Sequence, residues 1–334
     1  MSTFIKDIIK EIGEEHASVA SDITEVEQFV DTGSYIFNGL CSGSIFGGLS
    51  GNKITAIAGE SSTGKTFFSL AVVRNFLDSN PESCVLYFDT ESAITKSMLT
   101  ERGIDTDRVV VINVVTIESF RQKALQCIDK YLQMDEDKRQ PMMFVLDSLG
   151  MLSTEKEIGD ALADKQVRDM TKSQLVKGAF RMLTLKLGQA NVPLIVTNHT
   201  YDVIGAYVPT KEMGGGSGLK YAASTIIYLS KRKEKDGKDV IGNLIKAKTA
   251  KSRLSKENQE VTVRLYYDER GLDKYYGLLE LGELGGLWKN VAGRYEIDGK
   301  KLYAKQILAE PEKYFTAEVL EQLDVIARGV FTYG

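Results

Sequence analysis

The stretch that decides the fold is GESSTGKT at residues 59–66. It follows an apolar run, KITAIA (residues 53–58), and opens a helical pattern, TFFSLAVVRNFL (residues 66–77). A GxxxxGK[ST] spacing between a strand and a helix is typical of a phosphate-binding loop. Its glycines let backbone N–H groups curl around phosphates, and the helix N-terminus adds its dipole. The predicted nucleotide-binding residues are Gly59, Glu60, Ser61, Ser62, Thr63, Gly64, Lys65 and Thr66.

Two side chains of this loop carry specific chemistry. Lys65 would place a cation beside the β- and γ-phosphates, and Thr66 would offer its hydroxyl to magnesium. The plain alternative is a glycine turn that contains a lysine by chance, but both flanks have the required character. ATP and Mg²⁺ are therefore the predicted cofactors.

Apolar runs alternate with helical patterns through the middle of the chain. The runs lie at residues 53–58, 84–90, 109–113, 142–147, 193–198 and 224–229, and the helical patterns at 66–78, 94–102, 117–134 and 161–188. Such alternation predicts an α/β fold with a mostly parallel central sheet that is covered on both faces. Residues 31–51, rich in Gly and Ser, predict a loop-dominated segment. Residues 244–249 and 260–267 predict a hairpin that extends the sheet.

The chain of 334 residues is long enough for one large domain and a smaller one. We predict an N-terminal helical arm at residues 1–32, an ATPase core at residues 33–272, and a small C-terminal domain at residues 273–334. Trp288 and Tyr295 are the predicted anchors of the C-terminal core.

The composition narrows the class of protein. Apolar residues make up 43% and charged residues 26%, which is ordinary for a globular protein. No apolar run is long enough to cross a bilayer, and the three cysteines form no CxxC pair. We therefore expect a cytoplasmic protein without a disulfide framework or zinc site. The net charge of −4 does not favour nucleic acid, although a local basic patch would still bind phosphates.

Acidic residues end two of the predicted strands. Asp147 ends MMFVLD and is suited to hold a magnesium shell, although an acid that simply starts a loop is the alternative. Asp89 and Glu91 follow the strand at residues 84–90, and ligands of open α/β sheets bind outside the carboxyl ends of strands. Glu91 is the predicted base for the attacking water, with Asp89 the less favoured choice. A helix-start carboxylate is the alternative for Glu91.

His199 ends the strand LIVTNH and would be placed to sense the γ-phosphate, although a packed or surface histidine is commoner. The segment that follows, residues 200–218, is too polar and glycine-rich for a helix or strand. A loop of this length is usually functional. Its backbone N–H groups could bind DNA phosphates and its apolar side chains could stack on bases, with a mobile surface lid as the alternative. The candidate DNA-binding residues are Ile204, Tyr207, Val208, Gly214, Gly215, Gly216 and Ser217.

Two basic groups lie outside these strand ends. Arg168 and Lys172 share a helical face behind a second predicted loop at residues 154–166, and a solvated face is their plain explanation. Lys251 and Arg253 lie in the predicted hairpin. In phosphoryl transfer, a cation donated by a neighbouring subunit can stabilise the transferring group. Spacing alone favours an exposed hairpin charge for this pair.

Several segments together resemble RecA-family recombinases, and most closely the UvsX branch of large-tailed phages. They follow the family's order over residues 33–270, whereas hexameric helicases share only the first and third. The tail at residues 288–312 is similar to the family's small C-terminal domain. The segments are GESSTGKT, YFDTES, FVLDSLGML, EIGDALADKQVRDMTK, TNHTY, MGGGSGLKYAAS and AKSR.

The resemblance implies a homologous recombination protein that uses ATP, forms helical filaments on single-stranded DNA, and exchanges strands with homologous duplex DNA. It implies that Glu91 is the catalytic glutamate, Asp147 the Walker B aspartate, and His199 the switch between ATP and DNA. Residues 154–166 and 200–218 match the family's two DNA-binding loops.

The resemblance also implies contacts between subunits. Lys251 and Arg253 resemble the pair that reaches a neighbour's ATP, Lys220 and Tyr221 lie at the matching interface, and the N-terminal helix would pack on the adjacent protomer. Single-strand-binding and loader proteins are further implied partners. Met98 aligns with the aromatic that stacks on adenine in relatives, so this position departs from the family.

Two other functions remain open at this point. One is a RecA-fold hexameric helicase or packaging motor. The other is a recombination mediator that binds ATP as a switch without turning it over. The intact set of Lys65, Thr66, Glu91 and Asp147 argues against the mediator.

Overall fold

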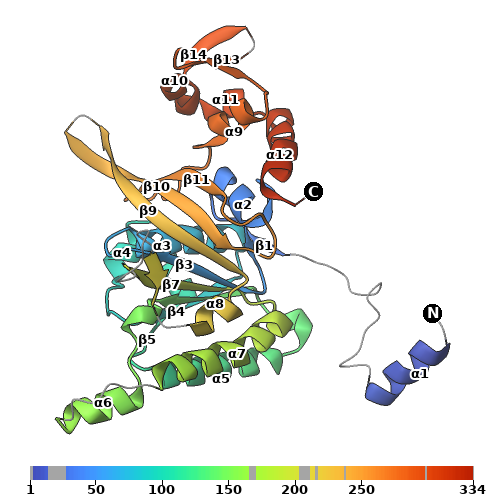
Figure 1. The fold of residues 1–334 in the computed structure, drawn as a ribbon, viewed down its shortest axis with the longest axis vertical. Coiled ribbons are helices and arrows are strands. Elements are labelled where there is room, and N and C mark those ends of the chain that lie inside the picture. Colours follow the sequence, from blue (N-terminus) through green and yellow to red (C-terminus); the bar gives the residue numbers. More distant parts are fainter. Residues whose placement is uncertain are drawn as a thin grey trace.

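The computed structural model describes residues 3–13, 28–164, 171–202, 211–214, 217–236, 238–297 and 299–333. Within these residues a sheet of nine strands forms the centre of the molecule (Figure 1), which confirms the predicted α/β fold. Eight strands follow the order β11-β10-β9-β3-β7-β6-β4-β5, and β8 pairs with β7. The strands are β3 (Ile54–Gly59), β4 (Cys84–Asp89), β5 (Val109–Asn113), β6 (Met142–Asp147), β7 (Leu194–Asp202), β8 (Lys211–Met213), β9 (Thr225–Asp236), β10 (Asp239–Lys251) and β11 (Glu260–Tyr266).

The sheet has a parallel part and an antiparallel part. Strands β9, β3, β7, β6, β4 and β5 run parallel to one another. Every residue of β3 and β6 is buried, as expected for parallel strands that are covered on both faces. Strand β10 runs antiparallel to both of its neighbours, β9 and β11, and the β10–β11 pair confirms the predicted hairpin.

Helices cover both faces of the sheet and divide the core in two (Figure 1). One apolar cluster holds α2 (Tyr35–Ser42) and α3 (Lys65–Ser79), and the other holds α5 (Ile117–Leu132), α7 (Lys172–Ala190) and α8 (Ser217–Ala222). The buried side of α5 carries apolar residues at helical spacing, so burial fixes its orientation. Burying one such large side chain contributes about 1.5–3 kcal/mol.

The prediction of a loop-dominated segment at residues 31–51 is wrong. Helix α2 lies inside it, between the two short paired strands β1 (Phe29–Val30) and β2 (Leu49–Ser50). Phe37 and Leu40 are fully buried in the first core cluster. This burial outweighs the low helix propensity of the local Gly and Ser residues.

The prediction of one helix at residues 161–188 is also wrong. Helix α6 spans Glu155–Leu162, inside the predicted loop at 154–166, and α7 begins only at Lys172. The Thr154 side chain accepts a hydrogen bond from the Glu157 N–H, and the Glu157 carboxylate accepts one from the Thr154 N–H. This reciprocal pair starts a helix earlier than the apolar pattern suggested.

The segment at residues 200–218 contains regular structure, contrary to the prediction. Strand β7 continues to Asp202, β8 pairs with it antiparallel, and α8 begins at Ser217. The sheet supplies partners for the backbone here, which overrides the polar composition. Residues 203–210, 215 and 216 lie outside the described residues.

The C-terminal region combines a three-stranded antiparallel sheet with helices. Trp288 and Tyr295 are both buried, and the Trp288 indole donates a 2.7 Å hydrogen bond to the Leu279 carbonyl. Asp324 accepts hydrogen bonds from the Ser44 hydroxyl and the Ile45 N–H at 2.6 and 2.8 Å, which ties this region to the core. The elements are α9 (Leu278–Leu284), β12 (Lys289–Val291), β13 (Arg294–Ile297), β14 (Lys300–Tyr303), α10 (Ala304–Ala309), α11 (Pro311–Tyr314) and α12 (Ala317–Phe331).

The predicted N-terminal helix is present as α1 (Thr3–Ile12). Its side chains Phe4, Ile5, Ile8 and Ile12 are exposed. Among the described residues, no helix combines the length and the apolar character needed to span a membrane. The three domain boundaries stay predictions.

Candidate functional site

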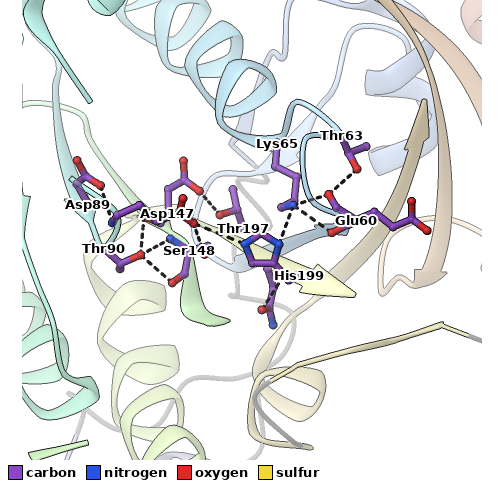
Figure 2. A network of polar contacts seen from close by, with 12 residues as sticks. Glu60, Thr63, Lys65, Asp89, Thr90, Asp147, Ser148, Thr197 and His199 are labelled. Atoms are coloured by element: carbon purple, nitrogen blue, oxygen red, sulfur yellow. Dashed lines mark hydrogen bonds and ion pairs between the residues drawn. The ribbon is translucent and has the colours of Figure 1, made fainter. Parts of the chain in front are cut away.

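The phosphate-binding loop lies at the carboxyl end of β3, between the ends of β7 and β9. Gly64, with φ +94°, takes a left-handed conformation and leads directly into α3. The Lys65 ammonium donates hydrogen bonds to the carbonyls of Gly59 and Glu60 at 3.0 and 2.9 Å. Figure 2 shows this ammonium between the loop and His199. Burial lowers the pKa of Lys65, while the nearby charges of Asp147 and Glu91 act in the opposite direction.

A cavity of about 640 Å³ opens beside the loop. This volume is within the range of small-molecule sites. On one side it is lined by Glu91, Asp147 and His199, and on the other by side chains from β9, β10 and the end of β11. The cavity therefore brings together the loop, the predicted base Glu91, the predicted magnesium ligand Asp147 and the predicted switch His199.

Asp147 lies at the end of β6, buried beside the loop. Its carboxylate accepts a 2.7 Å hydrogen bond from the Tyr87 hydroxyl and a second from the Thr197 hydroxyl. Burial and the charge of Asp147 raise the pKa of Tyr87, so Tyr87 stays a neutral donor. Two donors on one carboxylate fix the direction in which it points.

The residues present fit a magnesium ion. Thr66 and Asp147 both line the cavity and both offer oxygen, the ligand type that Mg²⁺ prefers. In the described part of the chain no group of three or more His, Cys, Asp or Glu gathers as a metal site. A magnesium ion beside a phosphate needs only one or two protein oxygens, since waters and phosphate oxygens complete its shell.

Asp89 and Glu91 have different surroundings, although both follow β4. Asp89 is buried, and its two oxygens accept the N–H groups of Glu91 and Ile94, each at 3.0 Å. The Glu91 side chain is 41% exposed and reaches into the cavity. It accepts a 3.2 Å hydrogen bond from the Ser148 hydroxyl. Asp89 thus holds the turn, and Glu91 is free to meet a ligand.

His199 lies between the lysine and the glutamate. Its Nδ1 is 3.4 Å from the Lys65 ammonium, and its Nε2 is 3.5 Å from the Glu91 carboxylate. The backbone carbonyl of His199 accepts a hydrogen bond from the Gly214 N–H at 3.0 Å. The preceding Asn198 amide donates to the Gly214 carbonyl at 2.8 Å. The ring of His199 therefore lines the cavity beside the phosphate-binding loop. Its backbone binds Gly214, which belongs to the glycine segment, our name for the glycine-rich residues 211–218.

A second link joins the loop to the glycine segment. Glu60 forms an ion pair with Lys211, at the start of β8. Gly214 lies beside the exposed Tyr201 ring, and an added Cβ there would be 2.8 Å from this ring, so a larger residue would displace it. Strands β7 and β8 thus connect both ends of residues 203–210 to the nucleotide cavity.

The predicted DNA contacts are only partly described. Lys172 begins α7 and lies 3.8 Å from the Glu157 carboxylate. Gly214 lies beside His199, and Ser217 begins α8. The other predicted contacts lie outside the described residues: Arg168, Ile204, Tyr207, Val208, Gly215 and Gly216.

Lys251 and Arg253 lie at the opposite edge of the sheet from their own phosphate-binding loop. Lys251 pairs with Ile226 at the start of β9, whereas Gly59 at the loop pairs with Leu229 farther along β9. The Lys251 ammonium donates to the carbonyls of Lys220 and Tyr221 at 2.7 and 3.2 Å. It therefore caps the end of α8, and burial together with the Arg253 charge lowers its pKa.

Arg253 differs from Lys251 in its contacts. It is exposed, and it makes no hydrogen bond or ion pair with the part of the chain that the structure describes. Tyr221 is 69% exposed beside it in the predicted interface, while Lys220 pairs with Glu212 at 3.3 Å. The opposite edge thus presents a cation and an aromatic side chain to solvent.

Sequence reasoning missed residues on the β9–β11 side of the cavity, namely Lys231, Asn243 and Tyr267. Lys231 and Asn243 come from antiparallel strands whose register no local pattern reveals, and Tyr267 directly follows β11. Met98, predicted to bind the nucleotide, packs against the core and is not among the described residues that line the cavity. Its role stays a prediction.

Comparisons with known proteins agree with this geometry. The RecA N-terminal domain family matches residues 1–273. The chain is 34% identical to the recombination and repair protein of Enterobacteria phage T4 over 278 residues, which is 83% of this chain and 69% of that protein. It is 27% identical to protein RecA of Arthrobacter sp. (strain FB24) over 258 residues, 77% of this chain and 70% of that one.

Protein RecA of Cereibacter sphaeroides is also 27% identical, over 77% of this chain and 71% of its own length. The family match covers the loop, the carboxylates and the polar end of β7, which are the features that gather in the cavity. The predicted resemblance, including its phage branch, is confirmed. A match of this extent, over a sheet and a phosphate-binding loop of the predicted kind, shows that this chain belongs to the RecA family.

Proposed function

We propose that the chain is an ATP-dependent recombination protein that forms helical filaments on single-stranded DNA and exchanges strands with homologous duplex DNA. Relatives named as a recombination and repair protein and as RecA support this function. The observation that carries it is the position of His199, whose ring lies against Lys65 and Glu91 and whose backbone binds the glycine segment. A nucleotide in the cavity would thereby act on the DNA-binding loop.

ATP would bind with its phosphates in the loop at residues 59–66. The Lys65 ammonium would leave the carbonyls of Gly59 and Glu60 for the β- and γ-phosphates, a stronger charge-assisted contact. Thr66 and Asp147 would hold the magnesium shell, and a bound Mg²⁺ would neutralise charge on the phosphates. The hydrogen bonds from Tyr87 and Thr197 keep the Asp147 carboxylate aimed at this position.

Glu91 would orient the attacking water and accept its proton. It reaches into the cavity, whereas both oxygens of Asp89 are engaged by backbone N–H groups. The Ser148 hydroxyl and the His199 ring hold Glu91 in place. A positioned general base of this kind typically contributes about 10²–10⁴ in rate. This makes the chain a DNA-dependent ATPase.

His199 would transmit the state of the nucleotide to the loop. A γ-phosphate near Lys65 and Glu91 competes for the contacts that the His199 ring makes. Movement of the ring shifts a residue whose backbone binds Gly214. The loop that follows then takes a DNA-binding arrangement, so ATP and DNA favour each other's binding.

The filament would complete the site between subunits. Lys251 and Arg253 lie at the opposite edge of the sheet from their own loop, which favours action on the nucleotide of a neighbouring subunit. Arg253 and Tyr221 face outward, with Lys220 beside them. The exposed apolar side of α1 would pack on the adjacent protomer.

Single-stranded DNA would bind through its backbone and its stacked bases, without sequence preference. Phosphate contacts make the affinity fall steeply with salt. Single-strand-binding and loader proteins are proposed partners of this reaction, which would take place in the cytoplasm. The proposed DNA contacts are Arg168, Lys172, Ile204, Tyr207, Val208, Gly214, Gly215, Gly216 and Ser217.

The decisive experiment is strand exchange between a single strand and a homologous duplex, with ATP and magnesium. We expect joint molecules and exchanged strands with the natural chain and none with Lys65→Ala. Electron microscopy of the same samples should show open helical filaments. Closed rings that unwind duplex DNA, or normal strand exchange by Lys65→Ala, would contradict the proposal.

A further inference from the structure

Strand β9 continues past the point where β3 ends. Leu229 pairs with Gly59, the last residue of β3, and β9 then runs on to Asp236. The residues after Leu229 therefore flank the phosphate-binding loop on the side away from His199 and the carboxylates. Lys231 is the first cation on this extension, two residues beyond the pairing with β3.

The Lys231 side chain is directed at the loop. Its ammonium donates a hydrogen bond to the carbonyl of Ser62, the fourth residue of the loop, and the side chain lines the nucleotide cavity. Within the described residues Lys231 forms no ion pair with a carboxylate. A cation that is held only by a neutral carbonyl keeps most of its charge available to an anion.

A buried amide beside the loop also points to a ligand. Asn243, on β10, is only 1% exposed, and its Oδ1 has no hydrogen-bond partner among the described residues. It lines the same cavity as Lys231 and lies close to Gly64, where an added Cβ would be 3.6 Å from the Asn243 Nδ2. Buried polar groups are normally paired, and an unpaired Oδ1 needs a hydrogen-bond donor. A water in the magnesium shell or a hydroxyl of a nucleotide would supply that donor, whereas a phosphate oxygen would not.

We propose that Lys231 is a second phosphate-binding cation that acts within its own subunit, with Asn243 as a polar contact beside it. The inference rests on the proposed nucleotide site and extends it to the β9–β10 wall. The ligand class is a nucleoside di- or triphosphate with magnesium. Such a ligand brings several negative charges, and the motif itself supplies one lysine.

The division of charge supports this assignment. Glu91 and Asp147 make the opposite wall of the cavity acidic, and the catalytic cations of the proposed mechanism come from another subunit. A polyphosphate bound before filament assembly would lack those cations. Lys231 would supply positive charge at that stage, so its main effect would be on affinity rather than on the rate of hydrolysis.

The test is ADP binding by calorimetry, with the full chain, magnesium and no DNA. We expect Lys231→Met to weaken ADP binding about tenfold at low salt, the lower range for a charge-assisted contact in an open site. The difference should shrink at high salt, and Lys231→Arg should restore most of the affinity.

Lys235→Met is the matched control. It removes the same charge from the same strand, about 13 Å farther from the loop. Lys235 does not line this cavity in the described structure, so ADP affinity should stay at the natural value. Thermal unfolding of each variant would show that none has lost its fold.

The outcomes separate this inference from the proposed function. If the natural chain binds no ADP, the nucleotide site itself is refuted. If the natural chain binds ADP, Lys65→Ala does not, and Lys231→Met binds as well as Lys235→Met, only the role of Lys231 falls. A loss of DNA affinity in Lys231→Met with unchanged ADP affinity would likewise overturn it and assign the residue to DNA.

Discussion

The two edges of the central sheet contrast in how complete they are. At the carboxyl edge of the parallel strands, the side chains of Lys65, Asp147 and His199 each contact neighbouring polar groups. At the opposite edge, Arg253 and Tyr221 face solvent. The carboxyl edge thus gathers most of the side chains of the proposed nucleotide site. The opposite edge presents exposed side chains, which we propose complete the nucleotide site of a neighbouring subunit.

The reason for the contrast is the direction of the strands. Parallel strands place all their carboxyl ends at one edge, so the loop and the polar residues after β4, β6 and β7 meet there. Strand β10 runs antiparallel to β9 and carries the chain back to the other edge. Residues at its end lie away from the phosphate-binding loop of their own subunit, and our proposal is that a second copy of the chain uses them.

The largest expected effect comes from removing Arg253, the exposed cation that we propose joins the opposite edge of one subunit to the carboxyl edge of the next. We expect Arg253→Ala to lower DNA-stimulated ATP turnover about 10³-fold, because a cation supplied to the transferring phosphoryl group has this size of effect. ADP affinity and thermal stability should not change, since Arg253 makes no hydrogen bond or ion pair within the described residues.

Mixing inactive variants would sharpen this test. A filament of Lys65→Ala and Arg253→Ala subunits contains some junctions with both an intact loop and an intact arginine. At equal amounts and random order, about a quarter of the junctions are intact in a head-to-tail assembly. Recovery of ATP turnover to this level would support action between subunits, whereas no recovery would place Arg253 in its own subunit's site or outside catalysis.

The second test concerns the carboxyl edge alone, through Glu91. Glu91→Gln should reduce ATP turnover by about 10²–10⁴, because an amide cannot accept the proton of the attacking water. Nucleotide affinity should stay near the natural value, as the amide retains a polar contact to Ser148. Turnover is measured at saturating ATP and DNA. A variant that binds ATP normally and hydrolyses it at the natural rate would show that the base is another residue.

A third test examines the link from the carboxyl edge to the proposed DNA-binding loop at residues 200–218. His199→Ala should remove the dependence of DNA affinity on ATP, which we expect to be on the order of tenfold in the natural chain. The measurement is binding of a labelled single strand with ATP, with ADP and without nucleotide. His199→Gln, which keeps a side chain able to donate and accept, is the control that should retain the coupling. Coupling that survives in His199→Ala would leave the Glu60–Lys211 pair as the alternative link.

The smallest expected effect is a difference in stability between variants of Lys251 and Arg253, the two cations of the opposite edge. Lys251→Met removes the hydrogen bonds to the last carbonyls of α8, so it should lower the free energy of unfolding by about 0.5–1 kcal/mol. Arg253→Met should leave it unchanged. Denaturant unfolding of the two variants measures this difference. Equal stability of both would mean that the cap on α8 contributes nothing measurable.

Local chemistry made much of this protein predictable. Neighbouring residues in the chain decide the GxxxxGKT loop, the apolar strands and the acids at the ends of these strands. The four residues predicted from these patterns all line one cavity: Lys65, Glu91, Asp147 and His199. The predictions failed where a capping box or a sheet partner decided the structure, as in α6 and β8. The contents of residues 203–210 stay predictions.

The sequence by itself therefore determined the fold class, the phosphate-binding loop and the acids beside it, because these follow from periodicity and from residues that are neighbours in the chain. Tertiary structure alone decided that Asp89 holds a turn while Glu91 enters the cavity, and that Lys231 and Asn243 line the other side of this cavity. It also decided that the strand leading to Arg253 ends at the opposite edge of the sheet from the phosphate-binding loop. The physical reason is that strand register and direction bring together residues that are far apart in sequence, and no local pattern specifies those pairings.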